Sequence, residues 1–391
     1  PNAFGKVVES LERLDKEYEV IVIEGAGSPA EVNLKANDIV NMRIARHLNC
    51  PVLLVTDIDR GGALASVVGT LELLDQEERD LIAGIIINKF RGDISLLQPA
   101  LDFLEKKTGK PILGVIPHMG NHGIEEEDSV VLDEKTDWDL DIDVIRTPRT
   151  SNFTDFQALS LEDGVRVRYV DRIQELGHPD LIILPGSKNT IEDLLFIRQS
   201  GLEAKLLAYH QQGNPIIGIC GGYQMLGEQI LDPDGVESDQ KEIRGLGLLP
   251  IVTTLSLEKI TRQVQASCED QHFLGEKITC ENFSGYEIHA GRTEFLNQRK
   301  SAFQILTDMD SLPDGMINSS ENVLGTYLHG VFDQDQYRTH LLKILHQRKN
   351  GGTEKKEVLM NYQEKKEEQY RNLSKTIRMN LDIELIKNLH F

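Results

Sequence analysis

Residues 215–226 read PIIGICGGYQML, and this sequence gives the clearest indication of the fold class of the second half of the chain. A short β-branched run ends at Cys220, which has one glycine two residues before it and another two residues after it. Such small neighbours permit a strained strand-to-helix turn that exposes a nucleophile, here a cysteine in the place of serine. The same letters also fit a buried structural cysteine beside a glycine turn. The stretch therefore predicts an α/β domain in which Cys220 is a candidate thiol nucleophile.

Other parts of this half supply the groups that a thiol nucleophile needs. The sequence LGTYLHG ends an expected strand at His329, a candidate general base that has to lie near Cys220 only in space. A turn after the apolar run LIIL contains Gly186 and Ser187, and an amide of either residue could face a developing oxyanion. The amide of Gly221 is the second candidate donor. Each feature alone is more often structural, but together they indicate nucleophilic catalysis at a carbonyl.

The rest of the chain alternates short apolar runs with helical stretches, which is typical of parallel α/β structure. In the first half the expected strands are residues 20–23, 52–55, 84–87 and 113–116, and the expected helices are residues 37–48, 62–74 and 95–107. In the second half the expected strands are residues 142–145, 165–170, 181–184, 216–219 and 325–328. The pattern predicts two doubly wound α/β domains.

A strongly acidic stretch at residues 123–143 separates the two series of strands, so we expect the domain boundary there. The predicted divisions are a nucleotide-binding domain at residues 1–136, a thiol domain at residues 137–350 and a helical tail at residues 351–391. Residues 232–242 are interpreted as a surface insertion in the thiol domain. In the tail we expect four apolar residues to pack back onto the body, namely Leu381, Ile383, Leu385 and Ile386.

Composition and charge argue against several classes of function. The 391 residues include 63 acidic and 42 basic side chains, and the net charge of −21 repels nucleic acid and anionic lipid. No apolar run is long enough for a membrane span and no signal peptide is evident, so we expect a cytoplasmic enzyme without a membrane partner. The cysteines form no C-x-x-C pair, so we expect neither a zinc site nor a disulfide among Cys50, Cys220, Cys268 and Cys280.

Three expected strands of the first half end in charged, glycine-containing loops. The first loop is Glu24-Gly25-Ala26-Gly27, in which a carboxylate could hold Mg²⁺ while backbone amides approach phosphate. The second reads DIDRGG at residues 57–62, and the third reads NKFRGD at residues 88–93. Ligands of parallel sheets lie beyond the carboxyl ends of the strands, so three such loops predict a binding site at one sheet edge.

Two resemblances narrow this interpretation. The order of the Gly186 turn, Cys220 and His329 resembles a class I glutamine amidotransferase domain over about residues 141–346. Val331 departs from that class, because a glutamate usually stands two residues after the histidine. Either Cys220 and His329 act as a dyad, or another acid such as Asp333 orients His329. Over nearly the whole chain, four motifs resemble the cobyric acid synthase family, namely EGAGSPAEVNL at residues 24–34, DIDRGG at 57–62, NKFRGD at 88–93 and GYEIHAG at 285–291.

The second resemblance implies a ligase that uses ATP and glutamine to amidate four peripheral carboxylates of a corrinoid, adenosylcobyrinic acid a,c-diamide, giving adenosylcobyric acid. Its synthetase half is similar to dethiobiotin synthetase, a P-loop NTPase, which makes Glu24 a candidate Mg²⁺ ligand and Asn88 a candidate adenine contact. No tightly bound prosthetic group is expected. The other roles implied are nucleotide contacts for Gly25, Ala26, Gly27 and Lys89, corrinoid or phosphate contacts for Asp57, Asp59 and Arg60, a glutamine contact for Gln224, and substrate or interdomain contacts for Tyr286, Glu287 and His289.

Other interpretations stay open from the sequence. They are a related corrinoid a,c-diamide synthase, a cysteine hydrolase of γ-glutamyl compounds, an ATPase-like binding module and a glutaminase or sensor subunit without ATP-dependent activity. The phosphate-loop pattern G-x-x-x-x-G-K-[ST] of the family occurs nowhere in the 391 residues. We therefore expect the first strand and the phosphate loop to lie upstream of residue 1, and ATP-dependent activity of this chain to be impaired.

Overall fold

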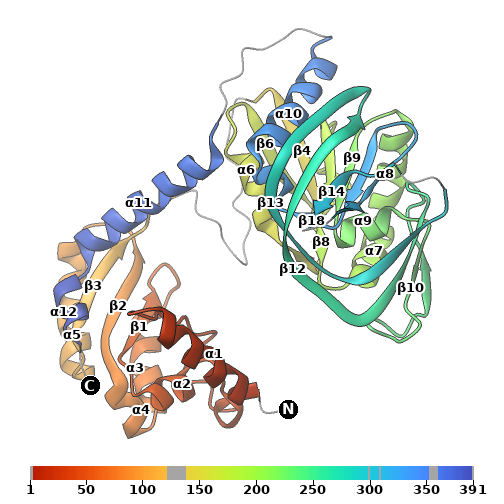
Figure 1. Ribbon diagram of the computed structural model, residues 1–391. Helices are drawn as coiled ribbons and strands as arrows, with labels where there is room; N and C mark the ends of the chain where they lie inside the picture. Colours follow the sequence, from red (N-terminus) through yellow and green to blue (C-terminus); the bar gives the residue numbers. More distant parts are fainter. Residues whose placement is uncertain (1–2, 121–137, 298–299, 308–309, 352–359, 390–391) are drawn as a thin grey trace. The chain divides into compact units, whose positions relative to one another are not determined.

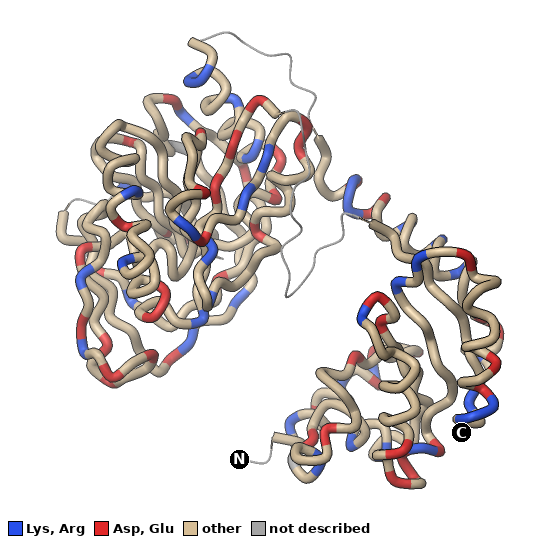
Figure 2. Tube along the Cα trace, turned by 180° about the vertical axis from the view of Figure 1, so that it is seen from behind, with Lys and Arg blue, Asp and Glu red and all other residues tan. Residues whose placement is uncertain are grey.

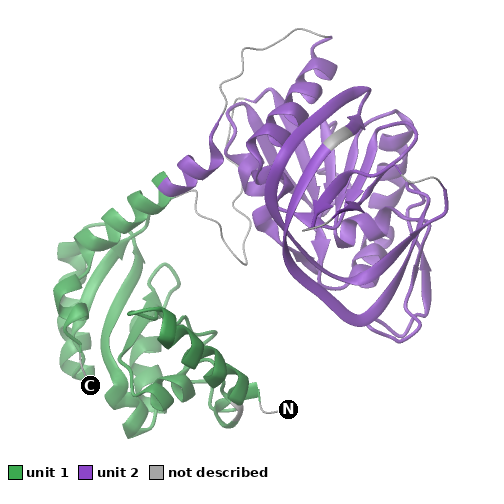
Figure 3. Ribbon diagram, in the orientation of Figure 1, with its two compact units in different colours: residues 1–122, 368–391 green, residues 123–367 purple. Residues whose placement is uncertain are grey.

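The computed structural model describes residues 3–120, 138–297, 300–307, 310–351 and 360–389, which belong to two compact units (Figure 3). The first unit comprises Pro1–His122 and Glu368–Phe391, and the second comprises Gly123–Glu367. Most of the acidic stretch at the expected boundary lies outside the described residues. Within those residues, no helix is both long and apolar enough to cross a membrane. Acidic and basic residues are interspersed along both units (Figure 2).

The first unit is built on a parallel sheet of three strands in the order β1, β2, β3 (Figure 1). These strands are β1 (Val52–Asp57), β2 (Ile82–Phe90) and β3 (Ile112–Pro117). The helices are α1 (Ala3–Glu17), α2 (Met42–Leu48), α3 (Ala63–Leu73), α4 (Gln76–Leu81) and α5 (Ile94–Thr108). Buried residues of β2, among them Ile85 and Ile87, share one core with Val67 of α3 and Leu104 of α5. The expected strands at residues 52–55, 84–87 and 113–116 are confirmed.

The expected strand at residues 20–23 is wrong. This segment is irregular, and Val20 and Val22 are 78% and 91% exposed. A β-strand needs a neighbour that pairs with its amides and carbonyls, and among the described residues no strand pairs with this segment. The β-branched composition of this segment is therefore not sufficient to make it a strand.

The helix expected at residues 37–48 begins later than predicted, at Met42. The carboxylate of Asp38 accepts hydrogen bonds from the amides of Val40, Asn41 and Arg43 at 2.9 to 3.0 Å. An aspartate that binds nearby amides offers the backbone an alternative to the helix. The segment therefore turns at Asp38 before the helix starts.

The end of the tail belongs to the first unit. Helices α11 (Tyr362–Asn380) and α12 (Ile383–Lys387) form the tail. Between them, Leu381 forms an isolated antiparallel β-bridge with Gly114 of β3. Leu381 and Ile386 pack against buried Leu113, as expected, whereas Leu385 is 41% exposed. A Cβ at Gly114 would lie 2.0 Å from the carbonyl oxygen of Asn380, so glycine is what permits this close approach.

The second unit contains a six-stranded sheet in the order β16, β17, β9, β7, β4, β6, parallel except for the β16–β17 pair. Its strands are β4 (Leu140–Ile145), β6 (Val165–Val170), β7 (Leu181–Leu184), β9 (Ile216–Ile219), β16 (Met316–Ile317) and β17 (Val323–Thr326). These confirm four of the expected strands, and residues 325–328 are divided between β17 and β18 (Leu328–His329).

Helices cover this sheet on both faces. Helices α7 (Thr190–Gln199) and α8 (Leu202–Gln211) share a core with Ile182 and Leu184 of β7. Helix α10 (Asp335–Lys349) packs in the other core, with Ile183. Short helices α6 (Gln157–Ser160) and α9 (Gly221–Leu226) complete the unit. The arrangement is the doubly wound α/β fold that the strand pattern predicts.

A second sheet of this unit is dominated by two long antiparallel strands, β12 (Ile251–Phe273) and β13 (Glu276–Phe295). Figure 1 shows them running together as a curved ribbon. Shorter strands pair around this ribbon, namely β10 (Gln229–Leu231), β11 (Glu242–Arg244), β14 (Phe303–Leu306), β15 (Ser311–Asp314) and β18. This sheet was not predicted from the sequence.

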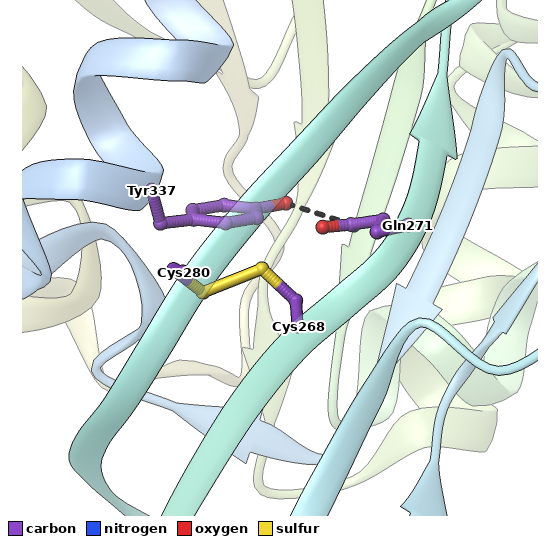
Figure 4. The surroundings of a disulfide bond; sticks show 4 residues. All are labelled: Cys268, Gln271, Cys280 and Tyr337. Atoms are coloured by element: carbon purple, nitrogen blue, oxygen red, sulfur yellow. Dashed lines mark hydrogen bonds between the residues drawn. A yellow bond between two sulfur atoms is a disulfide. The ribbon is translucent and has the colours of Figure 1, made fainter.

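The absence of a disulfide, expected from cysteine spacing, is also wrong. Cys268 and Cys280 are opposite each other in the β12–β13 register and form a disulfide bond (Figure 4). A hairpin brings residues that are distant in sequence into direct opposition, which a spacing rule does not detect. Beside the disulfide, the side-chain amide of Gln271 donates to the hydroxyl of Tyr337 at 3.3 Å.

Candidate active site

Cys220 lies at the turn between β9 and α9, with φ 50° and ψ −108°. Positive φ is strained for a residue with a Cβ, at a cost of about 1–3 kcal/mol, and such strain is concentrated at functional sites. The turn requires its glycines, because a Cβ at Gly222 would lie 2.0 Å from the carbonyl oxygen of Leu184. The thiol is buried, and the local geometry is that of a nucleophile elbow.

His329 lies beside Cys220 and is oriented by Asp155. Its Nδ1 lies 2.7 Å from a carboxylate oxygen of Asp155, and both side chains are buried. The other carboxylate oxygen accepts the amide of Gly330 at 3.1 Å. Burial lowers the pKa of His329, but the charge and hydrogen bond of Asp155, with contributions from Cys220, outweigh it and raise the pKa to about 10. Asp155, rather than Asp333, is therefore the acid at this histidine.

Tyr286 covers the face of the His329 ring. The two residues are paired in the register of β13 and β18, and their rings stack with centroids 4.8 Å apart and planes 7° apart. The hydroxyl of Tyr286 accepts a hydrogen bond from Asn152 at 2.8 Å, and Asn152 precedes the short helix that carries Asp155. Asn152 and Asp155 were not predicted from the sequence, because no local motif marks either residue.

The strand that carries Tyr286 also passes the thiol. Cys220 Sγ donates to the carbonyl of Ile288 at 3.4 Å. Next along the strand, the ring of His289 stacks on the ring of Tyr327, with centroids 3.8 Å apart. Nδ1 of His289 lies 2.9 Å from the carbonyl oxygen of Gly291. The motif GYEIHAG thus forms one wall of the thiol site.

Glu287, in the same strand, is buried and bound by two partners. It pairs with Arg262, and its other oxygen lies 3.8 Å from His289 Nε2. Burial would raise the pKa of Glu287, but the hydrogen bonds from His289 and Arg262 hold it below its ordinary value. Glu287 is therefore held in an ion pair within the second unit.

Gln224 is buried in α9, and both ends of its amide are occupied. Its Oε1 accepts from the Thr190 hydroxyl at 3.0 Å, and its Nε2 donates to the Tyr327 hydroxyl at 3.2 Å. The hydroxyl oxygen of Tyr327 in turn lies 2.6 Å from the hydroxyl oxygen of Thr293. These contacts fix the orientation of Gln224 beside the nucleophile helix.

The candidate oxyanion residues are brought together. A Cβ at Gly221 would lie 2.9 Å from the amide nitrogen of Ser187, and one at Gly186 would lie 3.4 Å from Cε1 of His329. The hydroxyl of Ser187 donates to buried Asp193 at 2.5 Å, which holds this loop against α7. The Gly221 amide opens α9, where the first amides lack helical partners. The thiol, the imidazole and these amides are suited to acyl transfer.

In the first unit, the loops after β1 and β2 meet at one sheet edge. Asp57 and Asn88 are register partners, and Nζ of Lys89 lies 3.3 Å from a carboxylate oxygen of Asp57. Arg60 Nε lies 3.9 Å from the same carboxylate, and Arg91 Nε donates to Asp59 at 3.0 Å. Burial raises the pKa of Asp57, but the Asp59 amide and the Lys89 ammonium hold it below its ordinary value. The edge therefore presents charged groups of both signs.

The loop Glu24–Gly27 is separate from these contacts in the structure. The carbonyl of Ala26 accepts a hydrogen bond from Asn41 at 2.7 Å, and Gly25 approaches the same side chain closely. Glu24 is exposed, and among the described residues it has no hydrogen bond or ion pair. Within those residues no group of three or more His, Cys, Asp or Glu could hold a metal ion. A single free carboxylate still fits Mg²⁺ bound largely through nucleotide phosphates.

The second unit, with a thiol elbow, a histidine and an acid on a doubly wound sheet, defines a class I glutamine amidotransferase domain. The first unit has the parallel sheet and charged strand ends of a nucleotide-binding α/β domain. Comparison with protein families agrees on both: residues 141–337 match the CobB/CobQ-like glutamine amidotransferase domain, and residues 4–124 match an AAA domain.

Sequence comparison with curated proteins identifies the family of this chain. The chain is 51% identical over 391 residues to the cobyric acid synthase of Desulfitobacterium hafniense, covering 97% of this chain and 75% of that protein. It is 50% identical to that of Moorella thermoacetica, covering 97% and 74%. PurLQS from Thermotoga maritima, a solved structure, superposes on 53% of the chain and 99% of its own length, with 19% identity and a TM-score of 0.42. The chain belongs to the cobyric acid synthase family and is a glutamine-hydrolysing carbon–nitrogen ligase of cobalamin biosynthesis.

Proposed function

We propose that this enzyme amidates four peripheral carboxylates of adenosylcobyrinic acid a,c-diamide, using ATP and ammonia that Cys220 releases from glutamine. The observation that carries the proposal is the strained Cys220 turn beside the buried His329–Asp155 pair. Nothing favours the related a,c-diamide synthase or a subunit without ATP-dependent activity. We place the enzyme in the cytoplasm, where ATP and glutamine are available.

In the thiol domain, Cys220 attacks the side-chain carbonyl carbon of glutamine as a thiolate. An adjacent imidazolium, which Asp155 favours at His329, stabilises that thiolate. The amides of Ser187 or Gly186 and of Gly221 bind the developing oxyanion. His329 then donates its proton to the departing nitrogen, and ammonia leaves a thioester on Cys220. Water, deprotonated by His329, hydrolyses the thioester, and glutamate leaves as the thiol is restored.

In the synthetase unit, a corrinoid carboxylate accepts the γ-phosphoryl group of ATP, giving an acyl phosphate and ADP, because a free carboxylate is too poor an electrophile for ammonia. Ammonia attacks the acyl carbon and phosphate leaves. Glu24 would hold Mg²⁺, which neutralises charge on the phosphates, while Gly25, Ala26 and Gly27 approach them. Further nucleotide and corrinoid contacts are assigned to the charged sheet edge, namely Asn88, Lys89, Asp57, Asp59 and Arg60.

The thiol site also suggests revised roles for residues first assigned to substrate. Tyr286 covers His329, and Glu287 and His289 are held within the same wall, so we assign them to positioning the thiol pair. Gln224 would border the glutamine while its own amide is held by Thr190 and Tyr327.

The test replaces Cys220 with serine in an intact enzyme and measures corrinoid amidation with glutamine and with ammonium as nitrogen sources. Glutamine-dependent amidation should fall by about 10³-fold or more, since the nucleophile is lost. Ammonium-dependent amidation should persist, because the synthetase chemistry does not need the thiol. Cys50→Ser is the matched control, since Cys50 is the other free cysteine and belongs to the first unit. Equal loss with both nitrogen sources would show that Cys220 is structural.

A further inference from the structure

The side chain of Arg338, in the first turns of α10, is fully buried although it carries a positive charge. Its Nε donates to a carboxylate oxygen of Glu162 at 2.6 Å, and its Nη2 donates to Asp335 at 2.6 Å. These carboxylates balance the buried charge. Burial of a guanidinium is costly, so its other contacts indicate what this position achieves.

The guanidinium of Arg338 binds the backbone segment that follows His329. Its Nη1 donates to the carbonyl oxygens of Phe332 and Asp333 at 2.9 and 3.3 Å. The amide of Asp333 donates to the carbonyl of Gly330 at 3.1 Å, so this segment forms a compact turn. Arg338 therefore fixes the chain on the C-terminal side of the catalytic imidazole.

Glu162 connects the same guanidinium to the segment that carries Asp155. The short helix with Asp155 runs directly into α6, and Glu162 follows α6 in the chain. The two segments also pack against each other, because the rings of Phe156 and Phe332 lie with centroids 6.3 Å apart. Arg338 thus bonds the segment of the histidine to the segment of its acid.

The remaining donor of the guanidinium reaches the start of the tail. Nη2 also donates to the carbonyl of Met360 at 3.0 Å, and Asp335 accepts the amide of Tyr362 at 3.1 Å. The five N–H groups of the guanidinium therefore have five acceptors, namely Glu162, Phe332, Asp333, Asp335 and Met360. A lysine carries its three donors on one nitrogen and cannot reproduce this planar arrangement.

We propose that Arg338 is a positioning residue for glutamine hydrolysis, which holds the segments of His329 and Asp155 together so that the imidazole stays aligned with Cys220. The inference rests on the proposed glutaminase function of Cys220. The acceptors of Arg338 include neither the thiol nor the imidazole, so it acts through their alignment. Misplacement of a reacting group by ~1 Å can slow a reaction by about 10²-fold.

The test replaces Arg338 with lysine, which keeps the charge but cannot join the segments. Glutamine hydrolysis is measured, and kcat is expressed per site titrated with 6-diazo-5-oxo-norleucine, a glutamine analogue that alkylates a competent thiol. We expect kcat per titrated site to fall by about 10- to 100-fold, while KM changes by less than about twofold.

A second measurement follows the reaction of Cys220 with iodoacetamide as a function of pH, by mass spectrometry of the peptide that contains this cysteine. A displaced imidazolium stabilises the thiolate less, so the alkylation profile of Arg338→Lys should shift to higher pH. A purely structural arginine would leave the profile of the folded protein unchanged.

Arg348→Lys is the matched control, because Arg348 is an exposed arginine of α10 that donates to the carbonyl of Gly213 at 3.1 Å. It should keep both kcat and the alkylation profile of the unmodified enzyme. If Arg338→Lys does not fold, Glu162→Gln decides, since it keeps an acceptor for Nε but loses the charge, and its kcat should fall by about 3- to 10-fold.

A normal kcat per titrated site with an unshifted alkylation profile, in whichever variant folds, would show that Arg338 only stabilises the fold and that the inference is wrong. A change confined to KM would overturn it as well. Failure of the unmodified enzyme to hydrolyse glutamine would instead contradict the proposed function.

Discussion

Asp155 fixes the imidazole of His329 through Nδ1 and leaves Nε2 for the reacting groups at Cys220. Replacing Asp155 with asparagine keeps the side-chain size but removes the charge that favours the imidazolium. We expect glutamine hydrolysis to fall by about 10²- to 10⁴-fold in kcat, while ammonium-dependent amidation is unchanged. Asp333→Asn is the control and should retain most glutaminase activity. If Asp333→Asn lost more glutaminase activity than Asp155→Asn, Asp333 would be the acid that orients His329.

The same pair predicts how stability depends on pH. The pKa of His329 is raised in the folded state from an ordinary value of 6.5 to about 10. Its contribution to stability is therefore complete below the ordinary value and is lost as pH rises through the folded value. Denaturant unfolding from pH 7 to 10 should show a declining free energy of unfolding in the unmodified protein. Asp155→Asn should flatten that decline, and an identical slope in both proteins would contradict the assignment.

Cys220 and His329 were predictable because each follows a recognisable strand, and the elbow glycines have a local steric cause. Asp155 was not predictable. It is 174 residues from His329, and no motif surrounds it, so only the tertiary fold brings the two together.

At the scale of elements, the β12–β13 hairpin supports the wall that passes Cys220, and its disulfide closes a loop with a sequence separation of 12. Removing the bond with Cys268→Ala and Cys280→Ala together should lower the free energy of unfolding by about 2–4 kcal/mol, because a cross-link restricts the unfolded chain. Urea denaturation under non-reducing conditions measures the effect. Cys50→Ala should leave the midpoint nearly unchanged, and equal midpoints for all three proteins would mean that the bond does not contribute.

The parallel strands were predictable from continuous apolar runs, whereas this hairpin was not. Buried and exposed residues alternate over only parts of its two strands, which also contain bulges, so no short window has a strong signal. At residues 20–23 the opposite occurred, because a strand was predicted and the structure has none there. Its composition favours a strand, but strand formation depends on a neighbour that composition does not reveal.

For the whole molecule, the proposed function assigns a separate half-reaction to each unit, so damage to one unit should spare the reaction of the other. Glu24→Gln should leave basal glutamine hydrolysis intact and reduce amidation with either nitrogen source by about 10²-fold or more, since charge on the transferring phosphoryl group is no longer neutralised. The matched control is Glu31→Gln, an exposed residue of the same segment. Unchanged ATP-dependent amidation in the Glu24 variant would show that the EGAG loop is a structural turn and does not hold Mg²⁺.

Isotope transfer measures whether nitrogen released at Cys220 enters the corrinoid. The enzyme is supplied with ATP, the corrinoid, glutamine labelled with ¹⁵N in its amide and an equal concentration of unlabelled ammonium, and the product is analysed by mass spectrometry. We predict that the new amides carry predominantly ¹⁵N in the unmodified enzyme and only unlabelled nitrogen in Cys220→Ser. Unlabelled amides from the unmodified enzyme, or labelled amides from the serine variant, would contradict the account.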